Sequence, residues 1–310
     1  GNLIQVTCGG TKILLDAGET LEEEADIPPQ AAWLTEPGGC DAVFLTHTHR
    51  DHMGLAEQIH PDIPLYLGYR AWKVLRAVNQ YLGRRTPSPA GFLEHGRPIQ
   101  IGELTVTPYL CDHSAFDSYI LLVEGGGQSL LYTGDFRGHG RKSYDALLQQ
   151  LPEQVDFLVC EGTNLSRQSQ EIWDEKTLES RAVDWMERCR GPVFVMQAAT
   201  NLDRLVSFYR AAARSGRIFL EDLYQAEAAC AAVPSIPQPG RFSNVRVFLP
   251  ARVAAENSRY QRFCAYGKAR ISRGQVPANS VICIRPSMQR WVERLAQRLP
   301  LTDSVLFYSL

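Results

Sequence analysis

The chain has 310 residues, of which 45% are hydrophobic and 21% charged, a balance typical of a folded globular protein with room for two domains. No run approaches the eighteen or so apolar residues of a membrane span, and no signal peptide stands at the start, which argues against membrane and secreted classes. The eight cysteines are scattered without a C-x-x-C pair, so we expect reduced thiols of a cytoplasmic protein and neither a disulfide framework nor a zinc ribbon.

The net charge of −2 hides an uneven distribution of charge along the chain. Residues 1–180 carry 13 Lys and Arg against 25 Asp and Glu, whereas residues 181–310 carry 19 against 9. Eighteen of those 19 cations are Arg, whose planar guanidinium suits bidentate contacts to phosphate. The distribution favours a polyanionic substrate, although solvated helix faces rich in Arg would explain the same counts.

The first predicted strands lead to a cluster of potential metal ligands. Residues 3–6 and 12–15 are expected to form a hairpin around Gly9-Gly10, and Asp16 directly follows the second strand. After an acidic, Pro-containing segment, residues 43–45 form a short apolar strand. Four potential ligands follow within six residues: His47, His49, Asp51 and His52. Imidazole and carboxylate groups suit zinc or a similar divalent ion; the alternative is a polar strand end whose histidines bond only to backbone.

Further potential ligands stand at the ends of later predicted strands. A strand at 64–67 and a helix at 70–82 precede a loop at 84–97 that is rich in Pro and Gly. From residue 99 the pattern becomes β, with strands at 104–111, 119–124, 129–133 and 156–160. Three of these strands run into acidic residues or histidine: Asp112-His113, Asp135 and Glu161. Such an arrangement is expected when an active site is built along one edge of a sheet.

From about residue 170 the pattern alternates between helix and strand. We expect helices at 177–190, 202–214 and 286–299, and strands at 192–196, 217–220, 245–249, 280–284 and 304–308. Thr200 or Asn201 is expected to cap the helix at 202–214. The repetition predicts a small parallel or mixed sheet with helical cover, so we place one domain at residues 1–170 and a second at residues 171–310.

The order of the motifs resembles the metallo-β-lactamase superfamily. The resemblance rests on four features: Asp16 after a hairpin, T-H-T-H-R-D-H at 46–52, D-H-S at 112–114 and G-D-F-R at 134–137. The resemblance implies an α/β protein with an αββα sandwich and a centre of two divalent metal ions, zinc or alternatively manganese. Such ions acidify a bridging water and stabilise the oxyanion of the transition state.

The same resemblance assigns roles to individual side chains. The first metal ion is expected on three histidines: His47, His49 and His113. The second is expected on Asp51 and His52, with Asp135 bridging the two ions. Asp16 is similar to the acid that orients the ligand loop from behind.

Other motifs are similar to the β-CASP nucleases, above all ribonuclease J-like enzymes. They are D-H-S-A-F-D-S at 112–118, T-G-D-F-R at 133–137, E-G-T-N at 161–164 and, more loosely, Q-A-A-T-N-L-D-R at 197–204. They imply a β-CASP-like α/β domain inserted at 171–310 and a catalytic set of Asp51, Asp135 and Glu161, the last tuning a metal ligand. Five residues are candidates for substrate contacts: Ser114, Arg137, Thr200, Asn201 and Arg204. For the last three, a helix cap with an exposed Arg is the alternative.

The chain departs from the family's pattern at both ends. His139 is the last histidine, so the family's final histidines are absent, and the earlier strand with its Gly-rich turn is absent as well. We therefore expect these 310 residues to be part of a longer protein. The alternative is a complete but catalytically degenerate paralogue.

The function implied is hydrolysis of RNA phosphodiester bonds by a metal-bound hydroxide. Single-stranded RNA is the expected partner, with no membrane association and with the oligomeric state left open. Two alternatives remain at this stage: a small-molecule hydrolase acting on thioesters or lactams, and a non-catalytic nucleic-acid-binding paralogue. The Arg-rich second half and the E-G-T-N motif favour the nuclease over the small-molecule hydrolase.

Overall fold

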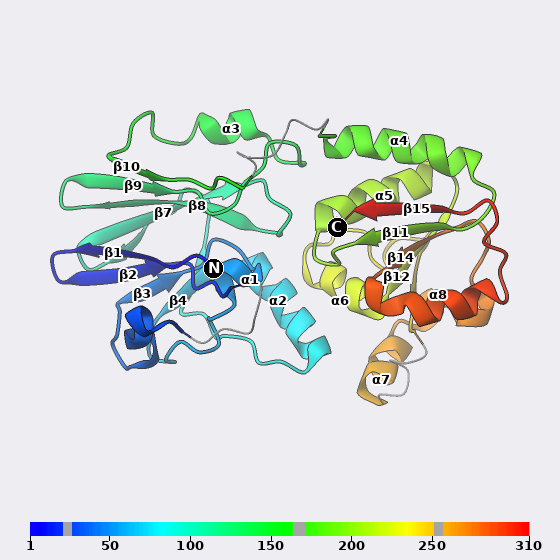
Figure 1. The fold of residues 1–310 in the computed structure, drawn as a ribbon, viewed down its shortest axis with the longest axis horizontal. Coiled ribbons are helices and arrows are strands. Elements are labelled where there is room, and N and C mark those ends of the chain that lie inside the picture. The colour runs from blue at the N-terminus through cyan, green and yellow to red at the C-terminus, as the bar shows by residue number, and fades with distance from the viewer. Residues whose placement is uncertain (21–26, 164–171, 251–256, 310) are drawn as a thin grey trace. The chain divides into compact units, whose positions relative to one another are not determined.

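The computed structural model describes residues 1–310 apart from 21–26, 164–171, 251–256 and 310. Contacts within the chain separate it into two compact units, Gly1–Glu171 and Ile172–Leu310 (Figure 1). Unit 1 has two sheets and unit 2 has one, and each unit has its own hydrophobic core. Among the described residues, the helices are all too short or too polar to cross a membrane.

The first sheet of unit 1 has five strands in the order β1-β2-β3-β4-β5. They span Ile4–Cys8, Thr11–Leu15, Ala42–Phe44, Leu65–Gly68 and Gly91–Leu93. β1 and β2 form the expected antiparallel hairpin, whereas β2 to β5 run parallel. β5 lies in the segment that the sequence predicts to be loop. It is a three-residue edge strand, too short for a hydrophobic pattern to reveal.

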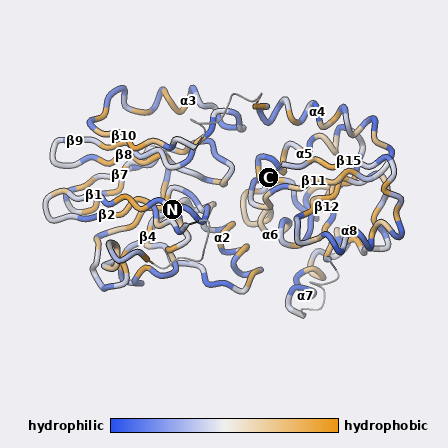
Figure 2. The backbone as a smooth tube through the Cα atoms, viewed as in Figure 1, coloured by the Kyte–Doolittle hydropathy of each residue, from blue (hydrophilic) through white to orange (hydrophobic). Residues whose placement is uncertain are grey.

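The second sheet of unit 1 also has five strands, in the order β10-β9-β8-β7-β6. They span Ile99–Ile101 (β6), Leu104–Cys111 (β7), Ser118–Gly125 (β8), Gln128–Tyr132 (β9) and Phe157–Val159 (β10). β6 to β9 pair antiparallel, and β10 runs parallel to β9. Figure 2 shows hydrophobic stretches along the strands of both sheets. Residues of these strands form the buried core between the sheets.

Unit 1 is a sandwich of four layers. Ile13 and Phe44 of the first sheet pack against Val106 and Leu121 of the second in one buried core. The outer face of the first sheet is covered by the 3₁₀ helix Pro29–Thr35 (η1) and by α2, Tyr69–Leu82. The outer face of the second sheet is covered by α3, Tyr144–Leu148. The αββα architecture expected from the sequence is therefore confirmed.

Unit 2 is a single parallel sheet with helices, in the strand order β13-β12-β14-β11-β15. The strands span Val193–Gln197 (β11), Ile218–Asp222 (β12), Val245–Phe248 (β13), Ser280–Ile284 (β14) and Val305–Ser309 (β15). The α-helices are Glu175–Arg188 (α4), Leu202–Arg214 (α5), Leu223–Ala231 (α6), Asn257–Ala265 (α7) and Gln289–Ala296 (α8). Short 3₁₀ turns lie at Gly267–Ala269, Arg273–Gln275 and Pro286–Met288.

The sequence pattern misses α6 for a physical reason. Five of the nine residues of this helix are buried, and they include the polar Gln225. A helix that is buried on most sides lacks the alternation of polar and apolar faces by which an amphipathic helix is recognised. The helix predicted at 286–299 is instead a 3₁₀ turn followed by α8, which ends at Ala296.

Candidate metal centre

The loops that follow strands of both sheets of unit 1 meet at one edge. The backbone N–H of Asp16, directly after β2, donates to the carbonyl oxygen of Phe44 at the end of β3 (2.8 Å). The N–H of Tyr119 in β8 donates to the carbonyl oxygen of Thr46 (3.0 Å), which joins the two sheets here. Three loops bring potential ligands to this edge, after β3, β7 and β9: residues 46–52, 112–117 and 133–137. The first of them contains the short helix α1, Arg50–Met53.

Four side chains form a first ligand group, with ligand atoms within 4.8 Å of one another: His47, His49, His113 and Asp135. The Nε2 atom of His47 is buried and has no hydrogen-bond partner among the described residues. The Nε2 atom of His113 lies 3.1 Å from Nδ1 of His49. A buried polar atom without a partner is costly, so a binding partner is expected at this point. Three imidazoles and a carboxylate are donors that zinc takes, and the group therefore fits a divalent ion.

Asp51, His52 and Asp135 form a second group that shares Asp135 with the first. His52 Nε2 is 3.1 Å from Oδ1 of Asp135 and 3.8 Å from Oδ2 of Asp51. The other oxygen of Asp135, Oδ2, is 3.8 Å from His113 Nε2. Asp135 thus presents one carboxylate oxygen to each group, which is the arrangement required of a ligand shared by two ions.

Asp16 holds the second group from behind. Its carboxylate is fully buried and accepts the backbone N–H of Thr46 (2.7 Å), the Thr46 hydroxyl (2.8 Å) and the hydroxyl of Tyr132 (2.7 Å). The Nδ1 atom of His52 lies 2.6 Å from the same carboxylate. Because Asp16 accepts the Nδ1 proton of His52, the Nε2 atom of that ring is directed to Asp135.

Thr46 extends the network to His47. Its hydroxyl has one proton, which it donates to Asp16, so it accepts from Nδ1 of His47 at 3.0 Å. This hydrogen-bond pattern assigns the Nδ1–H tautomer to His47 and leaves a lone pair on its Nε2 atom. Both buried histidines, His47 and His52, therefore turn Nε2 toward the ligand groups.

The charges of the centre act differently on its histidines. Burial and the neighbouring imidazoles lower the pKa of His47, and burial with the nearby His49 lowers that of His113 to about 3. These rings are neutral, as metal ligation requires. Burial alone would lower the pKa of His52 too, but its hydrogen bonds to Asp135 and Asp16 outweigh it and raise the pKa to about 10. The carboxylates thus favour positive charge at this point.

Glu161 supports the loop that carries Asp135. Its carboxylate accepts the backbone N–H of Phe136 (2.7 Å), and its own N–H donates to the Thr133 hydroxyl (3.2 Å). Gly134 has a φ of 50°, and a Cβ atom there would lie 2.8 Å from Oγ1 of Thr46. The close approach of the two ligand loops therefore requires glycine. Asn164, the last residue of the E-G-T-N motif, lies outside the described residues.

Two residues of the network, Asn2 and Tyr132, are missing from the prediction made from the sequence. The Nδ2 atom of Asn2 lies 2.9 Å from Nε2 of His52, and the Asn2 N–H donates to the carbonyl oxygen of Asp51 (2.7 Å). Tyr132 reaches Asp16 across 116 residues of sequence. Only its position at the end of β9, two residues before Gly134-Asp135, could have drawn attention to it.

The comparison with protein families fits this geometry. The family described as "Beta-lactamase superfamily domain" matches residues 11–196, more than half of the chain. The chain belongs to the metallo-β-lactamase superfamily. The four-layer sandwich and the ligand groups at its edge are therefore features of a metallo-β-lactamase domain.

Curated relatives of this metallo-β-lactamase protein include several ribonucleases. Ribonuclease J of Sinorhizobium meliloti is 26% identical over 223 residues, which cover 69% of this chain and 39% of that protein. Ribonuclease TTHA0252 of Thermus thermophilus is 26% identical over 190 residues, which cover 53% of this chain and 41% of that protein. Ribonuclease J of Mycobacterium tuberculosis is 29% identical over 232 residues, which cover 70% of this chain and 39% of that protein. The chain spans about two fifths of the length of these relatives.

A solved structure shares the fold. The crystal structure of a protein of unknown function from Enterococcus faecalis V583 matches the whole of this chain and 85% of that chain, with a TM-score of 0.74 and 17% sequence identity. At this identity the likeness concerns the fold alone. It shows that the fold of this chain recurs in a second protein.

Two predicted substrate contacts lie in loops of the metallo-β-lactamase centre. Arg137 donates its backbone N–H to the carbonyl oxygen of Asp112 (2.8 Å) and its Nε–H to the Asp112 carboxylate (2.9 Å). The ion pair is almost fully buried, so Arg137 ties the loop of Asp135 to the loop of His113. Ser114 follows His113 directly and is half-buried.

The predicted contacts in unit 2 stabilise its first helices. Asn201 caps α5, with its Oδ1 atom accepting the backbone N–H of Arg204 (3.2 Å), and Thr200 is half-buried in the preceding turn. The Nε atom of Arg204 lies 3.1 Å from the carboxylate of Glu175, which is 1% exposed and also accepts the Ser207 hydroxyl (2.6 Å). Arg204 is thus partly buried beside a carboxylate, unlike the exposed Arg of the capping interpretation.

Asp16→Asn should weaken zinc binding by roughly tenfold to hundredfold, because partners that orient metal ligands contribute on that order. An amide has a single acceptor oxygen and cannot hold the donors from Thr46, Tyr132 and His52 together. Competition titration of the purified protein against a chromogenic zinc chelator measures this affinity.

Asp145→Asn in α3 is the matched control, since Asp145 is exposed. Tyr132→Phe, which removes one donor to Asp16, should give a smaller loss if Asp16→Asn impairs folding. Wild-type zinc affinity in folded Asp16→Asn would contradict the role given to this carboxylate.

Proposed function

We propose that the protein is a metal-dependent hydrolase that cleaves phosphodiester bonds of RNA. The observation that carries the proposal is Asp135, whose two carboxylate oxygens face two separate groups of metal ligands. The ribonuclease names of the curated relatives support RNA as the substrate. The Arg-rich composition of residues 181–310 supports a polyanion as well.

The two groups would hold two divalent ions. His47, His49 and His113 suit zinc, with manganese as the alternative, and Asp51 with His52 would hold the second ion. Such ions, when bound, lower the pKa of water and neutralise charge that develops on phosphate oxygens. The protein's own contribution is to hold the ligands in place before substrate arrives.

The exposure of the ligands indicates the side from which a phosphodiester approaches. The side chains of His47 and His52 are buried behind the centre, whereas those of Asp51 and Asp135 are 32% and 23% exposed. The carboxylate side of the second group is therefore open to an incoming phosphate. We assign to Asp51, the more exposed of the two, the role of accepting a proton from the attacking water, and to Asp135 the role of holding the two groups together. Glu161 and Arg137 hold the loops that position them.

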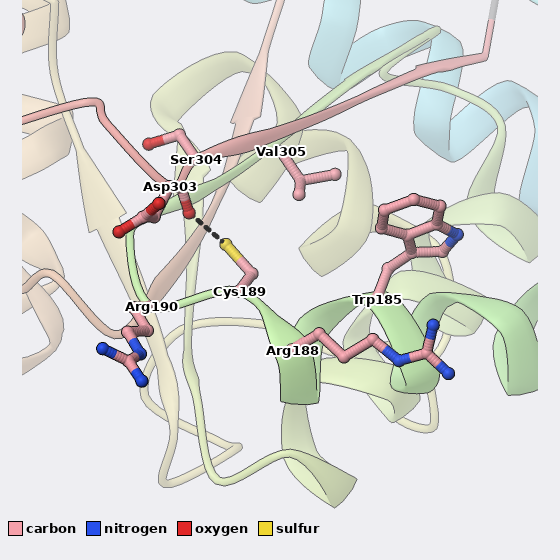
Figure 3. A pocket seen from close by; sticks show the side chains of 7 residues that line it. All are labelled: Trp185, Arg188, Cys189, Arg190, Asp303, Ser304 and Val305. Atoms are coloured by element: carbon pink, nitrogen blue, oxygen red, sulfur yellow. Dashed lines mark hydrogen bonds between the residues drawn. The ribbon is translucent and has the colours of Figure 1, made fainter.

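Unit 2 is proposed as a β-CASP-like domain that binds the RNA. Trp185, Arg188 and Arg190 at the end of α4 line a cavity with the start of β15 (Figure 3). Cys189 donates its Sγ–H to the carbonyl oxygen of Asp303 (2.8 Å) and so fixes this end of the helix. Arg188 and Arg190 are exposed, which distinguishes them from the paired Arg204. They are the cations best placed for phosphate contacts in this part of unit 2.

Asp135→Asn should lower the turnover of an RNA oligonucleotide by about hundredfold or more. The amide keeps the shape of the side chain but removes the charge that both ligand groups share, and metal ions contribute several kcal/mol of transition-state stabilisation. Initial rates on a fluorophore-labelled RNA, with a thioester and a β-lactam assayed beside it, measure the effect.

Asp145→Asn is again the matched control, and metal content should be determined for each variant. Wild-type turnover of RNA by metal-loaded Asp135→Asn would contradict the shared-ligand mechanism. Hydrolysis of the thioester or the lactam without any cleavage of RNA would reassign the centre to small-molecule substrates.

Replacement of Arg188 and Arg190 by Gln should flatten the salt dependence of RNA binding. Each phosphate contact with single-stranded nucleic acid contributes a slope of about −0.7 in log K against log salt concentration. Fluorescence anisotropy at several salt concentrations should therefore give a slope shallower by up to about 1.4 in the double variant. An unchanged slope would mean that these two arginines do not contact phosphate.

A further inference from the structure

A cluster of aromatic rings lies beside α2 in unit 1, outside the metal centre. Tyr69 and Trp72 of α2 and Phe92 of β5 have ring centroids 5.0 Å (Tyr69–Phe92), 5.7 Å (Trp72–Phe92) and 6.5 Å (Tyr69–Trp72) apart. We call these three rings the aromatic cluster. Tyr69 is 48% exposed, and the other two rings are half-buried. Large aromatic side chains that remain exposed together mark a contact surface more often than single ones do.

The aromatic cluster stands at the same sheet edge as the metal ligands. β3 and β4 run parallel, with Phe44 opposite Tyr66, and the Leu45 N–H donates to the carbonyl oxygen of Tyr66 (2.8 Å). Beyond this pair, β3 runs into Thr46-His47, while β4 runs through Gly68 into α2 (Figure 1). The first turn of α2 and the first histidine of the centre therefore leave adjacent strands at one edge.

A second connection comes from the loop of His113. Asp117 lies four residues after His113 and caps α2, although it is far from that helix in sequence. Its Oδ2 atom accepts the backbone N–H of Arg70 (2.9 Å) and of Ala71 (3.2 Å). Its Oδ1 atom accepts the hydroxyl of Tyr119 (3.1 Å), whose pKa is raised by burial and by the adjacent carboxylate, so the phenol keeps its proton. The loop that carries a metal ligand therefore fixes the helix that carries the aromatic cluster.

Cations accompany the rings on α2. The Lys73 ammonium lies 5.7 Å from the centroid of the Tyr69 ring, and the Arg76 guanidinium lies 5.5 Å from that of Trp72. Residues 69–82 contain Arg70, Lys73 and Arg76 but no Asp or Glu, although residues 1–180 as a whole have 12 more acidic than basic residues. α2 is thus a local positive surface next to a carboxylate-rich centre.

We propose that the aromatic cluster and the three cations of α2 form a binding site for single-stranded RNA beside the metal centre. Unpaired bases stack on Tyr69, and the cations contact the phosphates that join those bases. The inference rests on the proposed function, because it takes RNA as the substrate. Since every base has an aromatic face, the site should accept any sequence, and double-stranded RNA should bind less well because its bases are already stacked.

Binding of a phosphorothioate-linked RNA oligonucleotide, which resists hydrolysis, tests the proposal. Anisotropy titrations should show that Tyr69→Ala raises Kd about tenfold, within the range measured for loss of one stacked base. Tyr69→Phe, which keeps the ring, should bind like the wild type. Phe157→Ala is the matched control, because Phe157 of β10 is a ring of similar exposure (53%) in the same unit.

Photocrosslinking to the wild-type protein identifies the contacting residues directly, and its result does not depend on the stability of a variant. RNA that carries 5-iodouridine should crosslink to Tyr69 or Trp72, as mapped by mass spectrometry of the peptides. Replacement of Lys73 and Arg76 by Gln should also make the salt dependence shallower by about 0.7 for each phosphate that these cations bind.

The outcomes separate this inference from the proposed function. If the wild type binds and cleaves RNA while Tyr69→Ala keeps the wild-type Kd and no crosslink maps to α2, the site beside α2 is refuted and the proposed function stands. If the wild type neither binds nor cleaves RNA, both fall. Equal affinity for single-stranded and double-stranded RNA would refute stacking on the aromatic cluster.

Discussion

The metal centre depends on the buried carboxylate of Asp16. It accepts hydrogen bonds from Thr46 after β3, from His52 in α1 and from Tyr132 at the end of β9. An unpaired carboxylate at this depth would cost several kcal/mol, so all of these donors must be in place at once. Folding of unit 1 thereby sets the tautomers and orientations of His47 and His52. Asp16 itself has a φ of 58°, a conformation that is uncommon for residues other than glycine.

The remaining loops are tied to this network by single polar contacts. Glu161 holds the backbone next to Asp135, and the Arg137–Asp112 pair joins the loops after β7 and β9. Asp117 continues the chain of contacts to the first turn of α2. Side chains that are not themselves potential metal ligands thus position the loops that carry the ligands.

Much of the site could be predicted from the sequence because its ligands follow apolar strands directly. His47, His113 and Asp135 each lie shortly after the end of a strand, and the loops after β3, β7 and β9 meet at one edge of the sandwich. Contacts between distant residues could not be predicted: Asn2 meets His52 only in three dimensions. Arg204 shows most clearly what the sequence could not predict. An Arg in a capping motif does not reveal that a buried carboxylate, that of Glu175, lies beside it.

The central claim is that two ions share Asp135, and anomalous X-ray diffraction from zinc-loaded crystals tests it most directly. We predict two peaks, the first about 2.0–2.1 Å from nitrogen atoms of His47, His49 and His113. The second should lie between Asp51 and His52, with one oxygen of Asp135 on each ion. A single peak that leaves Asp135 uncoordinated, or zinc bound only elsewhere in the chain, would contradict the account.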